Sequence, residues 1–267
     1  GVLSASLLMN AGQVGLSYLV ICVSLAAFLV ITVKGTKETP RTQPADKLDI
    51  IGFIKNLWID PRKYPNFAWV WITRFLVVMG LWSVQEFMQF YLTDIIGISN
   101  DKKELYTGFM LLAVLICATI TGILGGAISD KIGRKPVVYV ANTVIALACF
   151  AFIFARSVET ALIFACIFGL GYGAYYSVDW ALGCDVLPSK DEAGKDMAVW
   201  HLAFVVPQSL VLPVAGTVLG AFGKTMQYTA GGPIARYSTN GYMALFIMAA
   251  CFLLLGAILL KNVKGVR

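Results

Sequence analysis

Two opposite charges interrupt long apolar runs in this 267-residue chain. Arg74 lies seven residues after Phe67, where one run begins, and Asp179 lies eight residues before Leu187, where another ends. At the helical rise these offsets are about 10 Å and about 12 Å. A charge at the centre of a membrane helix costs roughly 2.5–3.5 kcal/mol, so each needs compensation. We expect Arg74 and Asp179 to pair; the alternative is that Arg74 snorkels to the interface and Asp179 is capped locally.

Glu86 lies twelve residues beyond Arg74, roughly 18 Å along the same helix, so these two cannot pair directly. Gln85 and Gln89 flank Glu86 and add hydrogen-bonding groups. The group could bind a proton or the hydroxyls of a solute. The alternative is an interfacial carboxylate in water.

The run that carries Asp179 also holds a glycine triplet and three aromatic residues: Gly169, Gly171, Gly173, Tyr175, Tyr176 and Trp180. Glycines that bind a dinucleotide need a strand before them and a helix after them, whereas these lie inside an apolar helix. They predict close helix packing instead. The aromatic rings could face a sugar-like solute, or serve as packing and belt residues.

A charged turn separates two apolar runs, and its key residues are Gly126, Asp130, Lys131, Gly133, Arg134 and Lys135. Gly126 and the preceding Gly125 would let another backbone come close. We expect Asp130 to accept hydrogen bonds from N–H groups at a helix start. The basic residues could bind lipid phosphates or a carboxylate. The alternative is a turn whose positive charge only sets topology.

Composition places these residues in membrane helices: 58% of the chain is hydrophobic and 13% is charged, against about 25% charge in soluble proteins. The continuous runs predict helices rather than barrel strands. We expect seven spans, at about 14–33, 67–91, 105–128, 136–155, 160–183, 197–220 and 242–260. The six cysteines lack metal-ligand spacing and are expected to pack in these runs. The chain begins at Gly1 without a signal-peptide pattern, which suggests part of a longer protein.

Basic residues give the expected orientation. Roughly three times as many Lys and Arg fall on the side of segment 34–66, the 126–135 turn and the C-terminus as on the other side, which favours a cytoplasmic location. They share no single face, so nucleic acid is not an expected partner. Segment 34–66 begins as a Pro-containing linker, and Ile50 to Trp58 follow helical spacing. We expect a short helix at the cytoplasmic interface there, or loosely packed loop.

The charged turn resembles the loop motif of the major facilitator superfamily of secondary transporters. One linker followed by six spans is similar to the C-terminal half of such a transporter, an all-α membrane fold. The resemblance implies helix 6 at 1–33, the central cytoplasmic linker at 34–66, and a six-helix bundle at 67–267 that lacks its N-terminal half. It also implies that the turn holds the two halves of the transporter together in one of its access states. Asp130 and Arg134 would make the main contacts. Arg74 and Asp179 would then lie on helices 7 and 10, which face the central cavity.

The resemblance predicts secondary active transport of a small polar solute by alternating access. A sugar-like substrate is the first expectation and an organic anion the second, although the glutamine-rich helix-7 pattern of classical sugar porters is missing. Glu86 and Asp179 suggest proton coupling. The expected partners are a small-molecule substrate, protons, membrane lipids and the N-terminal half; no metal or cofactor is expected. The alternative is a non-transporting subunit or receptor built on this fold, and no nucleophile–base pair suggests an enzyme.

Single residues in the sixth span add two further expectations. His201, the one histidine, is expected near the cytoplasmic surface, as an interfacial residue or a proton relay. Pro207 and Pro213 should bend that helix.

Overall fold

A computed structural model describes residues 7–9, 11–36, 58–189, 192–229 and 232–265. Seven of its helices are long and apolar enough to cross a membrane, which confirms the predicted spans. They are α2 (Val14–Gly35), α4 (Pro65–Asp94), α5 (Lys103–Ile132), α6 (Arg134–Phe152), α7 (Val158–Asp185), α8 (Ala193–Ala221) and α9 (Thr239–Leu259). Several helices exceed the apolar runs by a turn or more at their ends, because polar residues there can remain helical outside the hydrocarbon core.

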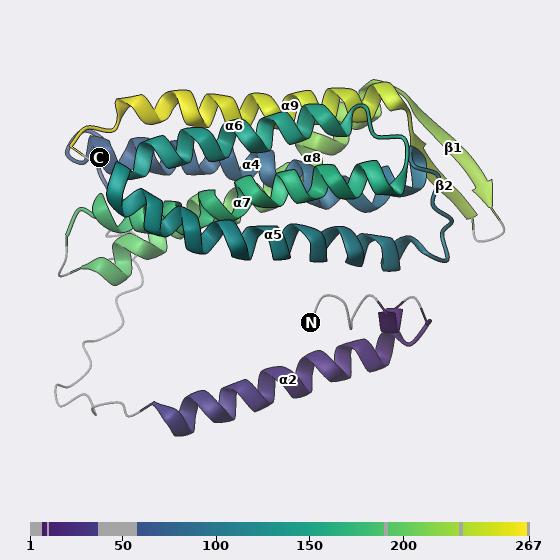
Figure 1. The fold of residues 1–267 in the computed structure, drawn as a ribbon, viewed down its shortest axis with the longest axis horizontal. Helices are drawn as coiled ribbons and strands as arrows, with labels where there is room; N and C mark the ends of the chain where they lie inside the picture. The colour runs from purple at the N-terminus through teal and green to yellow at the C-terminus, as the bar shows by residue number, and fades with distance from the viewer. Residues whose placement is uncertain (1–6, 10, 37–57, 190–191, 230–231, 266–267) are drawn as a thin grey trace.

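Six helices, α4 to α9, form one bundle, and α2 lies apart from it (Figure 1). The α7 helix packs against both α5 and α6, and α9 packs against α4 and α6. Large aromatic and aliphatic side chains fill the centre, including Tyr91, Phe152, Phe246 and Trp200. Almost all side chains of α2 are exposed and apolar, as expected for a helix surrounded by lipid or by another part of a protein.

Small residues bring α5 and α7 into close contact. A Cβ added at Gly169 would lie 2.6 Å from the carbonyl oxygen of Val114, and one added at Gly173 would collide with the backbone of Ala118. Gly125 meets α7 in the same way, 3.0 Å from the Cα of Ala174. The close packing predicted for the glycine triplet is therefore confirmed at these positions.

The two ends of the bundle differ. One end, here called the basic end, holds the α5–α6 turn, the α7–α8 connection and the C-terminal segment (Figure 1). The other holds the α4–α5 and α6–α7 connections and a two-stranded hairpin, β1 (Lys224–Thr229) paired with β2 (Gly232–Tyr237). Because α5 runs from Lys103 to Ile132, Lys102 and Lys103 lie at the opposite end from Asp130 and Arg134.

The β-hairpin departs from a purely α-helical bundle and was not predicted. Its segment is too polar to span a membrane and has no helical periodicity. The carboxylate of Asp94, at the end of α4, accepts hydrogen bonds from the backbone N–H of Tyr237 at 3.1 Å and from the hydroxyl of Tyr242 at 2.8 Å. These contacts hold the hairpin against the bundle.

The interfacial helix expected from Ile50 to Trp58 falls almost entirely outside the described residues.

Candidate functional site

Arg74 of α4 and Asp179 of α7 form an ion pair inside the bundle. Their side chains are 1% and 4% exposed, so neither reaches an interface. The hydroxyl of Tyr175, one turn before Asp179, donates to the other carboxylate oxygen at 3.0 Å. The predicted pairing is confirmed, and the alternative of a snorkelling Arg74 is wrong because an opposite charge lies at matching depth.

The indole ring of Trp200 on α8 stacks against the guanidinium group of Arg74. The guanidinium carbon lies 3.4 Å from the centre of the Trp200 ring, a cation–π contact in a desolvated setting. On α7, Gly183 touches the same indole: an added Cβ would lie 2.5 Å from Cε2. The indole of Trp71 donates to the carbonyl oxygen of Val199 at 3.0 Å and ties α4 to α8. Three helices thus fix this charged centre.

An aromatic surface covers the charged centre where α4, α7 and α8 meet. Trp180 is 45% exposed and contacts Trp200 edge-on at 4.9 Å between ring centres. Phe204 packs at the centre of this surface, and its ring contacts three others: Trp82, Tyr176 and His201. We call these five rings, Trp82, Tyr176, Trp180, His201 and Phe204, the aromatic surface.

His201 belongs to this surface rather than to the end of α8. It is exposed and stacks on Phe204 with 5.4 Å between ring centres. The helix begins at Ala193, so His201 is about 12 Å along it. Since α8 begins four residues before the predicted apolar run at 197, the expected position near the membrane surface stays a prediction.

The site residues predicted in the last third of α4 do not contact the charged centre. Glu86 and Gln89 are half-buried, and Glu86 makes no ion pair with any described residue. Gln85 lines a small apolar pocket together with Met88, Met110 and Phe168. These residues stay candidates by type and not by contact with Arg74 or Asp179.

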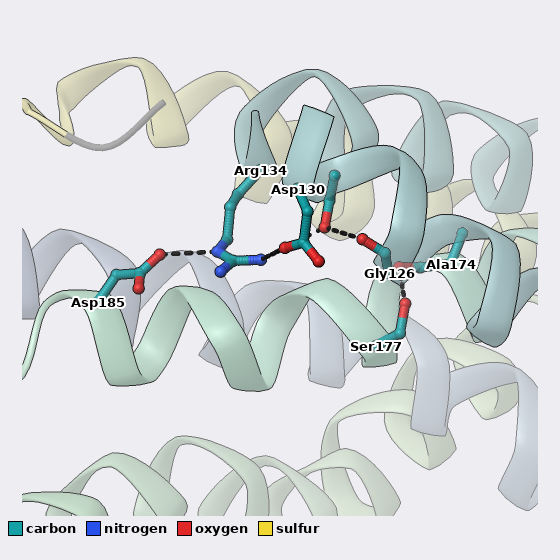
Figure 2. Close-up of polar contacts among 7 residues, drawn as sticks. Gly126, Asp130, Arg134, Ala174, Ser177 and Asp185 are labelled. Atoms are coloured by element: carbon teal, nitrogen blue, oxygen red, sulfur yellow. Dashed lines mark hydrogen bonds and ion pairs between the residues drawn. The ribbon is translucent and has the colours of Figure 1, made fainter. Parts of the chain in front are cut away.

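A second charged network lies at the basic end, around Arg134 (Figure 2). Its Nε donates to Asp185 of α7 at 2.7 Å, and its Nη1 donates to Asp130 of α5 at 3.1 Å. Arg134 itself opens α6, so one side chain joins the ends of three helices. Together with Ser129, Lys131, Gly133 and Gly265, these residues line a hollow of about 500 Å³.

The structure corrects two expectations about this turn. Asp130 lies in the last turn of α5 and binds Arg134, whereas the predicted cap of a helix start does not form. The reason is that α5 continues to Ile132, and Gly133 reverses the chain alone with φ 98° and ψ 160°, a conformation that favours glycine.

The small-residue contact is made by Gly125, whereas a Cβ at Gly126 would meet no described atom within 4 Å. Lys135 donates to the carbonyl oxygen of Val263, and Lys131 is exposed. Of the basic residues, Arg134 thus binds carboxylates, which was one of the two expected roles, and Lys135 binds the backbone.

Sequence reasoning missed Asp185 and the C-terminal contact. Asp185 carries no motif signal, because its partner lies 51 residues away. Asn66 at the start of α4 exchanges two 2.8 Å hydrogen bonds with the backbone N–H and carbonyl oxygen of Lys264. Together with Lys135, these bonds fasten the C-terminal segment to the basic end.

Comparison with known proteins agrees with this architecture. The sequence profile of the Major Facilitator Superfamily matches residues 1–211 and, in a second match, residues 104–265. The chain belongs to this superfamily. As a facilitator, it is a multi-pass integral membrane protein with the helical membrane fold of that family.

Two curated relatives of this facilitator carry names that describe export or drug resistance. The fujikurins efflux protein of Gibberella fujikuroi is 23% identical over 243 residues, which are 90% of this chain and 45% of that protein. The chloramphenicol resistance protein CraA of Acinetobacter baumannii is 29% identical over 131 residues, which are 49% of this chain and 29% of that protein. The chain thus spans less than half the length of either relative.

Proposed function

We propose that this chain is the C-terminal half, with the preceding helix, of a secondary transporter that exports a partly apolar organic solute by alternating access. The observation that carries the proposal is the buried Arg74–Asp179 pair beneath the aromatic surface. Burying charges inside a membrane bundle is costly, and charged residues found there usually belong to a substrate or ion pathway. On this reading, α2 is helix 6, residues 34–66 are the central linker, and α4 to α9 are helices 7 to 12.

The aromatic surface supports an aromatic or otherwise apolar solute over a sugar. Two of its five rings, Trp180 and His201, are exposed, and aromatic rings bind planar apolar groups. A polyol needs several hydrogen-bonding groups, and the groups that could supply them, Gln85, Glu86 and Gln89, lie about one to two turns beyond Trp82 along α4. The printed names of the two relatives also support export of metabolites or drugs.

Asp179 is the proposed coupling residue. Its carboxylate holds Arg74 when ionised, and a proton on it would release Arg74 from the pair. Without its ion pair, Arg74 would no longer hold α4 against α7, and the two helices could adopt a different packing. Protonation of Asp179 would thus be linked to helix movement. Glu86 is the second candidate proton site.

The Arg134 network is the proposed gate. It joins the ends of α5, α6 and α7 only while Asp130, Arg134 and Asp185 stay within hydrogen-bonding reach. A movement that separates α5 from α7 would break it. The network would therefore favour one of the two access states.

The test is transport by the full-length protein in liposomes with and without a pH gradient. Radiolabelled chloramphenicol serves as the aromatic probe and radiolabelled sucrose as the sugar. We expect gradient-dependent movement of the aromatic probe, loss in Asp179→Asn, and no movement of sucrose. Sucrose transport would restore the sugar-like expectation, and equal behaviour of protein-containing and protein-free liposomes for both probes would favour a non-transporting subunit or receptor.

A further inference from the structure

Two buried N–H groups in the charged centre have no acceptor among the described residues: Nε of Arg74 and Nε1 of Trp200. Both side chains are almost completely buried. Buried donors are nearly always paired in proteins, so two in one place call for an explanation. The ion pair uses Nη1 of Arg74, which leaves Nε free for another acceptor.

The two donors belong to one rigid stack. The guanidinium carbon of Arg74 lies 3.4 Å from the centre of the Trp200 ring, so the two donors belong to side chains in direct contact. Asp179 fixes the guanidinium, and Gly183 fixes the indole because any side chain there would collide with it. Donors on fixed side chains are preorganised for an acceptor.

Trp180 separates this stack from the exterior of the bundle. Its ring lies 5.7 Å from the Arg74 guanidinium carbon and edge-on to Trp200, while 45% of the residue is exposed. A change of the Trp180 rotamer would join the donors to the aromatic surface. Trp180 is therefore placed as a movable cover.

We propose that Arg74 Nε–H and Trp200 Nε1–H bind the carbonyl oxygen of a neutral aromatic solute, which enters when Trp180 moves aside. Both groups only donate, so they select an acceptor. Asp179 already neutralises Arg74, so a neutral acceptor leaves the buried site without net charge, whereas an anion would leave it negative. The neighbouring rings select the aromatic part. This proposal deepens the export function above and rests on it.

The test is photolabelling of the detergent-solubilised full-length protein with benzophenone, whose excited carbonyl joins to nearby C–H bonds. We expect adducts in peptides spanning residues 175–183 and 197–204. Trp200→Phe keeps a ring but removes the donor, and Arg74→Lys keeps the charge but removes Nε–H. Each should lower labelling of these peptides roughly tenfold at subsaturating probe, the usual cost of an unpaired acceptor. Trp58→Phe is the control, because Trp58 is 77% exposed and outside the bundle.

Three competitors define the chemical class. Acetophenone should reduce labelling, and ethylbenzene, which lacks the carbonyl oxygen, should not. Stronger competition by benzoate would overturn the neutral class in favour of an anion. Labelling that Trp200→Phe and Arg74→Lys leave unchanged would overturn the site, because the donors would then bind only water.

The outcome is separable from that of the transport assay. Binding in detergent needs no gradient, so specific labelling without liposome transport would contradict the export function alone. Transport of the aromatic probe with unaffected labelling in both variants would contradict the carbonyl site alone.

Discussion

At the scale of single residues, the charged centre depends on reciprocal compensation. Arg74 and Asp179 each remove the cost of burying the other, and Tyr175 and Trp200 complete their surroundings. Removing one partner of a buried pair costs more than replacing both, because the remaining charge stays without compensation. Stability and transport should therefore respond differently to single and double changes.

Asp179→Asn should lower the free energy of unfolding by roughly 3–5 kcal/mol, because Arg74 loses its counter-charge. The double variant Arg74→Met with Asp179→Leu should recover most of this loss while remaining inactive in transport. Thermal unfolding of the full-length protein in detergent measures the first effect, and liposome flux measures the second. A double variant less stable than Asp179→Asn would contradict the proposed energetic role, and Glu86→Gln serves as a control that leaves the pair intact.

Gly133 is the second position where one residue decides local structure. Its φ of 98° is unfavourable for any residue with a Cβ. Gly133→Ala should therefore cost about 1–3 kcal/mol and loosen the Arg134 contacts. Hydrogen exchange at the α5–α6 turn should rise, whereas Gly194→Ala, in open space near the start of α8, should leave it unchanged. Unaltered exchange in Gly133→Ala would show that the turn does not need this conformation.

At the scale of helices, α5 and α7 contact each other closely through glycines. The positions of Gly169 and Gly173 on α7 leave no space for a Cβ, whereas Gly126 on α5 has open space among the described residues. Close backbone contact without large side chains is typical of helix pairs in membranes. Because the two backbones touch, a larger side chain at the contact should push the two helices apart.

Gly173→Ala should force α5 and α7 apart and cost about 1–3 kcal/mol, the usual range for overpacking. Gly126→Ala is the matched control and should be tolerated, since alanine favours a helix more than glycine does. Melting temperature and monodispersity of the full-length protein after purification report the difference. Equal damage from both changes would place Gly126 in a close contact with a part of the protein beyond the described residues.

The C-terminal segment is the second feature at this scale. Asn66 supplies both a donor and an acceptor to Lys264, so Asn66→Ala should release residues 261–265. Asn66→Asp keeps the acceptor and should give an intermediate effect. Hydrogen–deuterium exchange of that peptide is the measurement. The same exchange in all three proteins would mean that the buried Leu260 and Val263, and not Asn66, hold the segment.

At the scale of the whole molecule, charge separates the two ends of the bundle. Among the described residues, more Lys and Arg lie at the basic end, with the Arg134 network and the C-terminal segment, than at the other end, which holds the β-hairpin. The basic end is the proposed cytoplasmic side. The almost completely exposed α2 agrees with a position against lipid or against a part of the protein beyond this bundle.

Cysteine labelling tests this orientation. In a cysteine-free background of the full-length protein, Lys102→Cys should react with an impermeant maleimide added outside right-side-out vesicles, whereas Lys131→Cys should react only after permeabilisation. Both side chains are exposed, so access and not burial controls the result. Labelling of both from one side would contradict the topology.

The sequence alone determined the membrane class, the seven spans, the family resemblance and the Arg74–Asp179 pair. Each follows from a local pattern, because long apolar runs must span lipid and a charge within them needs a partner at equal depth. Tertiary structure decided what depends on distant contacts. Asp185 as a partner of Arg134, Trp200 beneath Arg74, His201 on the aromatic surface and the Asn66–Lys264 contact join separate segments of the chain. No local pattern encodes them, since helix packing alone sets which side chains meet.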